Sequence, residues 1–179
     1  GMDIKLHAEQ SGNCQGAELA AANKAISADH LDHISNHGID AMQRAGTIAV
    51  LLPGVNFHQM AFNSVPPVDK LLHAGIPIAI ASDYNPGSSP TPSMQMILAL
   101  ACRLFKMTYA QAINAATINA AWALDLGRSV GSLEPGKAAD ITIFSCPSHG
   151  MIIDRFGVNQ VDTVIKAGRV VAAGQRVIG

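Results

Sequence analysis

Strand-like and helix-like segments alternate along the first two-thirds of the chain, and this alternation limits its possible folds more than any other feature. Short apolar runs with β-branched residues are typical of buried strands, and they occur at residues 3–7, 26–29, 47–52 and 76–82. Segments that are rich in alanine, or have apolar residues three and four positions apart, separate them at residues 16–25, 35–45 and 66–74. Gly46 and Gly75 stand where helix C-caps belong, each just before a strand. The pattern predicts βαβ units whose parallel strands are buried on both faces.

The last third of the chain has a different pattern. A long helical region at residues 93–105 and 108–126 comes first, with Thr108 as the expected N-cap of its second helix. Short strands follow after Gly131, at residues 139–144, 163–166 and 169–173, and Ala167-Gly168 between the last two is typical of a hairpin turn. We therefore predict a boundary near residue 130, with an α/β domain at residues 1–130 and a small β module at residues 131–179.

The composition excludes several classes of protein. Only 14% of the residues are charged and 49% are hydrophobic, whereas an ordinary soluble domain has roughly 25% charged residues. Such a chain can bury a core, which excludes intrinsic disorder. Its net charge of −1 and its scattered basic residues argue against nucleic-acid binding. The longest apolar stretch, residues 94–105, is interrupted by Gln95 and Arg103 and is shorter than the about 20 residues that a membrane span needs. We therefore expect neither a nucleic acid nor a membrane as a partner.

The cysteines give no sign of a disulfide framework. Cys14, Cys102 and Cys146 are odd in number, lie far apart and form no C-x-x-C pair. No basic region with a following apolar run, as in a signal peptide, precedes the first predicted strand. The simplest interpretation is a protein of the reducing cytoplasm.

Polar side chains that are able to bind a ligand stand at the ends of three predicted strands. These side chains are His7, His30 and Asp83. Functional groups of parallel α/β folds gather at the carboxyl ends of the strands. Imidazole nitrogen and carboxylate oxygen suit Zn²⁺ or Fe²⁺, which lowers the pKa of a bound water. The alternative is that both histidines are hydrogen-bonded core residues and that Asp83 caps a helix. Spacing alone leaves both interpretations open.

The loop that follows the fourth predicted strand, residues 83–92, is rich in proline, glycine and serine. Such a loop is usually a connector, but here it offers Asn85, Ser88 and Ser89 to a ligand beside Asp83. A phosphate-binding loop is disfavoured because neither G-x-G-x-x-G nor G-K-[ST] is present. Most other histidines are expected on solvated surfaces, although His58 follows the third strand and is a second candidate for the pocket mouth.

Four segments together resemble the imidazolonepropionase family, which belongs to the metal-dependent amidohydrolase superfamily. They are His7–Gln10, Ser27–Leu31, Ala49–Gly54 and Asp83–Pro90. Two further segments are similar to the tail of many amidohydrolases and support only the superfamily: Asn119–Ala121 and Gly131–Asp140. The resemblance runs from about Ile4 to the C-terminus.

The resemblance implies a metal-dependent hydrolase that opens the cyclic amide of 4-imidazolone-5-propanoate to give N-formimidoyl-L-glutamate, in histidine degradation. His7 and Asp83 match metal ligands for a single zinc or iron ion at the top of a (β/α)₈ barrel. His30 matches the histidine that polarises the ring carbonyl, and Asp83 is also placed to handle the proton of the attacking water. The implied catalytic residues are therefore His30 and Asp83.

The resemblance also implies a set of substrate-binding residues. Gln10 falls where the family has a glutamate or glutamine that contacts the substrate; an amide there bonds the ring but is a poor base. Asn85, Gly87 and Ser88 match the loop that holds substrate and product. The partner implied by these residues is a small molecule.

The chain departs from the family in its size. A (β/α)₈ barrel takes about 250 residues and eight strands, whereas about four strands are predicted here. The family's H-x-H metal pair is missing, because none of the seven histidines forms an H-x-H. We therefore predict a partial TIM-type barrel of about four βα units, followed by a small β module from the amidohydrolase β-sandwich.

A half-barrel of this kind has consequences for activity and assembly. With two of the metal ligands, the isolated chain is expected to be inactive. Its open edges and inner face are expected to be covered by self-association, as a homodimer. Two alternatives remain at this point: another cyclic amidohydrolase or deaminase of the same superfamily, and a non-catalytic half-barrel that serves for self-association.

Overall fold

The computed structural model describes residues 3–178, which form two sheets with helices packed around the first. The first sheet is parallel and has its strands in the order of the chain. These strands are β1 (Lys5–Ala8), β2 (Ser27–His30), β3 (Ile48–Leu51) and β4 (Ile78–Ile80). The second sheet is antiparallel, in the order β5 (Ile141–Phe144), β6 (Val161–Lys166), β7 (Arg169–Ala173) and β8 (Arg176–Val177). The protein is therefore a mixed α/β fold with a parallel sheet of four strands.

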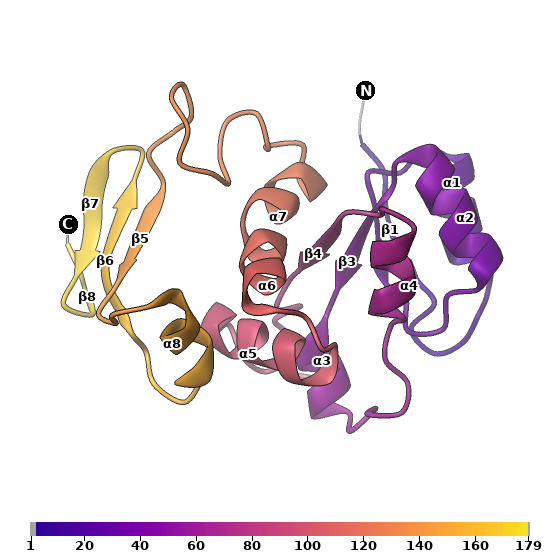
Figure 1. The fold of residues 1–179 in the computed structure, drawn as a ribbon, viewed down its shortest axis with the longest axis horizontal. Coiled ribbons are helices and arrows are strands. Elements are labelled where there is room, and N and C mark those ends of the chain that lie inside the picture. Colours follow the sequence, from indigo (N-terminus) through magenta and orange to yellow (C-terminus); the bar gives the residue numbers. More distant parts are fainter. Residues whose placement is uncertain (1–2, 179) are drawn as a thin grey trace.

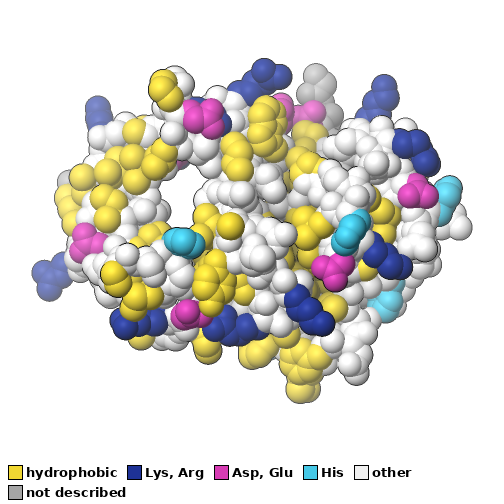
Figure 2. Space-filling model, in the orientation of Figure 1, with side chains coloured by type: hydrophobic (Ala, Val, Ile, Leu, Met, Phe, Trp, Pro, Cys, Tyr) yellow, Lys and Arg dark blue, Asp and Glu magenta, His cyan; other side chains and the backbone are white. Residues whose placement is uncertain are grey.

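Eight helices connect or flank these strands in the described residues. They are α1 (Gly16–Ala22), α2 (Asn36–Ala45), α3 (Pro53–His58), α4 (Val68–His73), α5 (Met94–Leu104), α6 (Tyr109–Ala116), α7 (Ile118–Ala123) and α8 (His149–Asp154). The antiparallel sheet lies at one end of the molecule and α1, α2 and α4 lie at the other, with α5, α6 and α7 between them (Figure 1). Figure 2 shows an opening between the antiparallel sheet and the neighbouring helices.

The predicted strands of the parallel sheet and the helices between them are all present. Gly46 is the C-cap of α2 with a φ of 73°, and Gly75, with a φ of 72°, follows the C-cap of α4. Thr108 is the N-cap of α6 and forms a capping box with Gln111. Its side chain accepts from the backbone N–H of Gln111, and the Gln111 side chain accepts from the backbone N–H of Thr108. The hairpin at Ala167-Gly168 is also confirmed, with φ values of 49° and 79° that suit a tight turn between antiparallel strands.

The prediction of one continuous helix over residues 108–126 is wrong. The helix breaks at Thr117, whose φ of −122° and ψ of −93° are not helical, and α7 starts at the next residue. The Thr117 hydroxyl donates to the carbonyl of Ile113, 2.7 Å away, a local bond that competes with the helical backbone pattern. The short elements α3, α8 and β8 were not predicted. Pro53 stands at the first position of α3, where proline favours a helix, although Pro53-Gly54 reads as a turn in the sequence.

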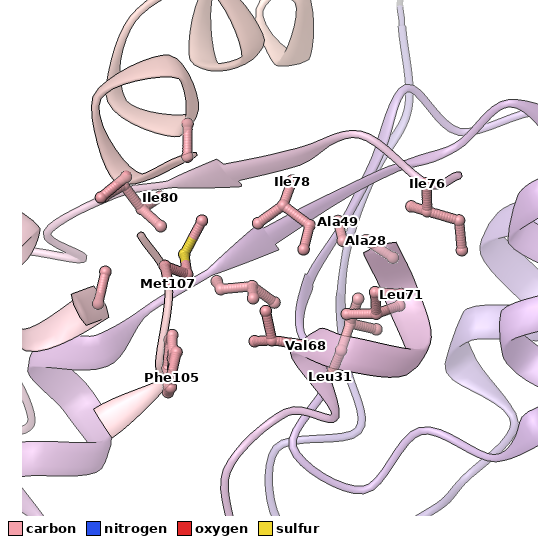
Figure 3. Packing of buried hydrophobic residues seen from close by; sticks show 14 of the residues in the cluster. Ala28, Leu31, Ala49, Val68, Leu71, Ile76, Ile78, Ile80, Phe105 and Met107 are labelled. Atoms are coloured by element: carbon pink, nitrogen blue, oxygen red, sulfur yellow. The ribbon is translucent and has the colours of Figure 1, made fainter. Parts of the chain in front are cut away.

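The main hydrophobic core lies on one face of the parallel sheet, between the strands and the helices that cover it (Figure 3). Leu31, Val68 and Leu71 point into this core together with Ile78 and Ile80 from β4. The opposite face is covered over a smaller area, where Ala123 of α7 packs against Ile48 and Ala79. The sheet is thus closed on one face and largely open on the other.

The open face carries a row of residues that are partners across the four strands. His7 lies opposite Asp29, Asp29 opposite Val50, and Val50 opposite Ala79. A cavity of about 150 Å³ lies on this face, beside Lys5 and Asp29 and below α7. No helix among residues 3–178 is both long enough and apolar enough to cross a membrane. The domain boundary near residue 130 stays a prediction.

The packing on the buried face of the parallel sheet leads to a quantitative prediction about stability. Leu71 of α4 is fully buried, so Leu71→Ala is expected to lower the free energy of unfolding by about 2–5 kcal/mol through lost burial and a residual cavity. Leu19→Ala is the matched control, because Leu19 also lies in a helix but is 56% exposed, and its effect is expected to stay below about 1 kcal/mol. Urea unfolding followed by circular dichroism measures both. Equal losses in the two variants would contradict the assignment of the core.

Candidate active site

Three side chains that are far apart in the sequence meet at the carboxyl edge of the parallel sheet. His7 lies in β1, His30 is the last residue of β2, and Asp83 follows β4. The rings of His7 and His30 pack edge to face, with their centroids 4.5 Å apart and their planes at 65°. Nε2 of His30 lies 3.9 Å from Oδ2 of Asp83. The sequence-predicted strand-end residues are therefore neighbours in space.

The backbone at this edge adopts unusual conformations that aim these side chains. His30 and Leu31 both have left-handed φ values, 75° and 68°, and Asp83 has a φ of 48°. Non-glycine residues in this region carry strain, which persists only where the surrounding structure holds them. Leu31 is held in this way, since its side chain is fully buried and its N–H donates to the carbonyl of Ala8, 3.0 Å away. The strain therefore lies in the turn that carries His30 and at Asp83 after β4.

Burial determines the charge of the site. Burial and, to a lesser extent, the nearby His7 lower the pKa of His30, which Asp83 opposes, and together they bring this pKa to about 4. At neutral pH His30 is therefore an uncharged imidazole, with one nitrogen that donates and one that accepts. His7 and Asp83 are both exposed, so neither is a core residue. The alternative that Asp83 caps a helix also fails for α5, the next helix, because the N-cap of α5 is Ser93.

The residues of this edge provide part of a metal-binding set. His7 supplies an imidazole nitrogen and Asp83 a carboxylate oxygen, which are the donor types that zinc and iron accept. Within residues 3–178, however, no group of three or more His, Cys, Asp and Glu side chains is arranged to hold a metal ion. The two donors fit a metal site by their chemistry, but they are too few to complete one.

The loop after β4 is organised by the side chain of Asn85. Its Oδ1 accepts from the backbone N–H groups of Gly87 at 2.9 Å and Ser88 at 2.8 Å, and its Nδ2 donates to the carbonyl of Asp83 at 2.7 Å. Ser89 is fully buried and its hydroxyl donates to the carbonyl of Ser82, 2.6 Å away. The loop is therefore a tight turn held by Asn85 and Ser89. Gly87 is exposed in it, and the half-buried Ser88 accepts from Nδ2 of Asn85 through its hydroxyl, at 2.8 Å.

Gln10, the other predicted substrate-binding residue, is half-buried in the segment between β1 and α1. The neighbouring Glu9 is a residue that the sequence analysis missed. It is buried, and its carboxylate accepts from the N–H groups of Cys14 at 2.7 Å and Ala17 at 3.1 Å. Since the N-cap residue Gln15 makes no side-chain bond, Glu9 supplies the acceptor at the start of α1. An acid next to a strand end is the only sequence signal of this role.

A second missed group lies behind His30, where loops after β2 and β3 meet. Asn56 of α3 donates from Nδ2 to Oδ1 of Asp32 at 2.9 Å and to the carbonyl of Ser64 at 3.0 Å. The Ser64 hydroxyl lies 2.9 Å from Nε2 of His33. Burial raises the pKa of Asp32, which the bond from Asn56 opposes. His58, at the end of α3, is exposed, and its place at a pocket mouth stays a prediction.

The chain as a whole matches known proteins. The model of the Amidohydrolase family matches residues 1–171. An imidazolonepropionase of Treponema denticola is 45% identical over 178 residues, which are 99% of this chain and 43% of that protein. An imidazolonepropionase of Geobacillus kaustophilus is 49% identical over 96% of this chain and 40% of that protein. The chain thus spans less than half the length of these relatives.

Solved structures with the same fold are more distant in sequence. An adenosine deaminase from Xanthomonas campestris with bound zinc has a TM-score of 0.82 and 22% identity, over 99% of this chain and 47% of that one. A Xaa-Pro dipeptidase has a TM-score of 0.77 and 22% identity, over 97% of this chain and 45% of that one. At such identities the likeness extends to the fold alone.

The half-buried Asp32 leads to a prediction about the pH dependence of stability. Its pKa is higher in the folded than in the unfolded protein, so the unfolded chain loses this proton first as the pH rises. This carboxyl therefore lowers the free energy of unfolding as the pH rises from about its unfolded pKa, near 3.9, through its folded pKa. Asp32→Asn removes the ionisation but keeps an oxygen that accepts from Asn56. We expect this variant to gain stability relative to the parent between pH 4 and pH 7.

Urea unfolding at several pH values measures this difference. The control is Asp40→Asn, which removes an exposed carboxylate from α2. A difference between the parent and Asp32→Asn that does not change with pH, or that changes in the opposite direction, would contradict the prediction.

Proposed function

This chain belongs to the amidohydrolase family, and we propose that within the family it forms the C-terminal part of an imidazolonepropionase. The observation that carries the proposal is the high identity to relatives of that name over nearly the whole chain. The reaction is the hydrolysis of 4-imidazolone-5-propanoate. The oxygen of water adds to the ring carbonyl carbon, the cyclic C–N bond breaks, and the leaving nitrogen takes up a proton to give N-formimidoyl-L-glutamate.

The proposal assigns each part of the chain a place in a larger protein. Residues 1–130 form the C-terminal half of a (β/α)₈ barrel, and residues 131–179 form a segment of a β-sandwich. Four parallel strands in sequential order, connected by helices on one face, support this assignment. The other strands of the barrel, and the remaining metal ligands, belong to sequence that this chain does not contain.

His7 and Asp83 would hold one divalent ion, zinc or iron, together with ligands from the missing half. Such an ion acts as a Lewis acid and makes water a stronger acid. Asp83 stands beside this position and accepts a proton from the attacking water. His30 is uncharged at neutral pH and 3.9 Å from Asp83, and its N–H donates to the ring carbonyl oxygen as negative charge develops there.

The substrate would lie against two segments of the same edge. Gln10, beside β1, donates from its amide to the imidazolone ring. Gly87 and Ser88 form the other wall, and the hydrogen bonds that their N–H groups donate to the Asn85 side chain fix this turn before substrate arrives. A wall that is ordered in advance loses little conformational freedom on binding, which favours affinity.

A chimera tests the proposed activity. In it, this chain replaces the matching segment of the Geobacillus kaustophilus relative, so that a complete barrel is present. We expect the chimera to open the ring of imidazolonepropanoate, measured by loss of its ultraviolet absorbance, and we expect the isolated chain to show no turnover and little bound metal. Turnover by the isolated chain with stoichiometric metal would contradict the claim that its site is incomplete.

Substitutions in the chimera test the roles of single residues. Asp83→Asn and His30→Asn are each expected to lower kcat by about 10²–10⁴, the contribution of a positioned acid or base. The controls are Asp40→Asn and His149→Asn, which change exposed residues of the same types away from the site. A substrate panel of other cyclic amides and of aminopurines accompanies these assays. A chimera that prefers one of them would assign the chain to another amidohydrolase activity.

The isolated chain is also proposed to associate with a second copy through the open face of its parallel sheet. Val50, which is only partly buried beside the cluster under α7, makes part of this face apolar, and β1 lies at an unpaired edge of the described sheet. We expect a homodimer at low micromolar concentration, measured by light scattering after gel filtration. A monomer under these conditions would contradict this proposal without affecting the proposed activity of the complete protein.

A further inference from the structure

We infer that the hydrogen bond between Asn56 and Asp32 is a positioning device that aims the ring of His30 at His7 and Asp83. The chemical importance of His30 rests on the proposed function, whereas its position is a property of this chain. Neither Asn56 nor Asp32 touches the reacting atoms, so both are positioning residues. They act through the backbone of the turn that follows β2.

The first step concerns the strain at this turn. Strand β2 ends at His30, and two successive residues, His30 and Leu31, adopt left-handed φ values of 75° and 68°. Each non-glycine residue in this conformation costs about 1–2 kcal/mol, so that an unrestrained chain would leave it. The contacts on either side of the turn therefore decide where the His30 ring points.

One side of the turn is fixed from within the core. The side chain of Leu31 is fully buried among the residues of Figure 3. Its N–H donates to the carbonyl of Ala8 in β1, 3.0 Å away, and this contact ties the turn to the strand that carries His7. Beyond Leu31, the N–H of His33 donates to the carbonyl of Glu9, 3.0 Å away, so the backbone is held on both sides of Asp32 while the Asp32 side chain still needs a partner.

The side chain of Asp32, on the other side of the turn, is held by Asn56. This residue is 3% exposed, and the same Nδ2 reaches Oδ1 of Asp32 at 2.9 Å and the carbonyl of Ser64 at 3.0 Å. Ser64 in turn contacts Nε2 of His33 through its hydroxyl, at 2.9 Å. Both residues that follow the strained pair are thus held by the segment that follows β3.

The choice of side chains supports a positioning role over packing alone. Asp32 is kept at a site where burial disfavours its charge, which weakens folding rather than strengthening it. An ionised aspartate accepts hydrogen bonds without donating any, so in its contact with Asp32 the Asn56 amide is always the donor. The result is a single arrangement in which the His30 ring lies 4.5 Å from the His7 ring and 3.9 Å from the Asp83 carboxylate.

The experiment measures this arrangement directly in the chain as it is. Histidines labelled with ¹³C and ¹⁵N give a nuclear Overhauser effect between the rings of His7 and His30 in the parent. Asn56→Asp has nearly the same shape but removes both donated hydrogen bonds and puts a second carboxylate beside Asp32. We expect this variant to lose the Overhauser effect while its circular dichroism stays that of a folded protein.

A rescue variant and a matched control complete the design. Adding Asp32→Asn to Asn56→Asp restores one hydrogen bond in the reverse direction and removes the repulsion, so the Overhauser effect is expected to return. Asn63→Asp makes the same chemical change at an exposed position between α3 and α4, and it is expected to keep the effect. If Asn56→Asp does not fold, Asp32→Ala decides instead, because it removes the same contact while Asn56 keeps its bond to Ser64.

The outcomes separate this inference from the proposed function. An Overhauser effect that persists in Asn56→Asp or Asp32→Ala, with a lower unfolding free energy, would make the contact merely structural and overturn the inference. No metal or substrate enters the measurement. An inactive chimera would therefore overturn the proposed function and leave the positioning result as it stands.

Discussion

Four parallel strands in the order of the chain place all their carboxyl ends along one edge of the sheet, and every feature of the candidate site depends on this constraint. A polar residue of an otherwise apolar strand does not disturb the core when it lies at this edge. His7, His30 and Asp83 do so from three different strands or their ends. The topology brings these residues together, and the local backbone conformation then sets the direction of each side chain.

The adjustment requires strain, and the strained residues include His30 and Asp83 of the candidate site as well as the core residue Leu31. His30 and Leu31 are left-handed because the chain must turn away from β2 while it keeps one side chain in the core and the other at the edge. Glu9, after β1, and Asn56, in α3, perform comparable tasks, since each has a buried side chain that bonds backbone or carboxylate groups of another segment. The edge is thus held by hydrogen bonds among its loops, while the hydrophobic core fixes the strands.

The sequence allowed the fold to be predicted where the signal is local. Apolar β-branched runs marked the four parallel strands, and Gly46 and Thr108 marked helix ends, because each of these signals acts within a few residues. The break at Thr117 and the helix at Pro53 escaped prediction, since the first depends on a side chain competing with the backbone and the second begins with residues typical of turns. The strand-end residues were found from topology. Asn56 was not, because its partners lie 24 and 8 residues away and only the fold brings them together.

The two faces of the parallel sheet differ in a way that bears on the low charge of the chain. One face is closed by helices and needs no charges. The other presents Lys5, His7 and Asp29 beside Ile48 and Val50, so it is neither a normal solvated surface nor a finished core. Charged residues at 14% of the chain are sufficient for a sheet that is enclosed on both sides, and they are too few for one that faces water.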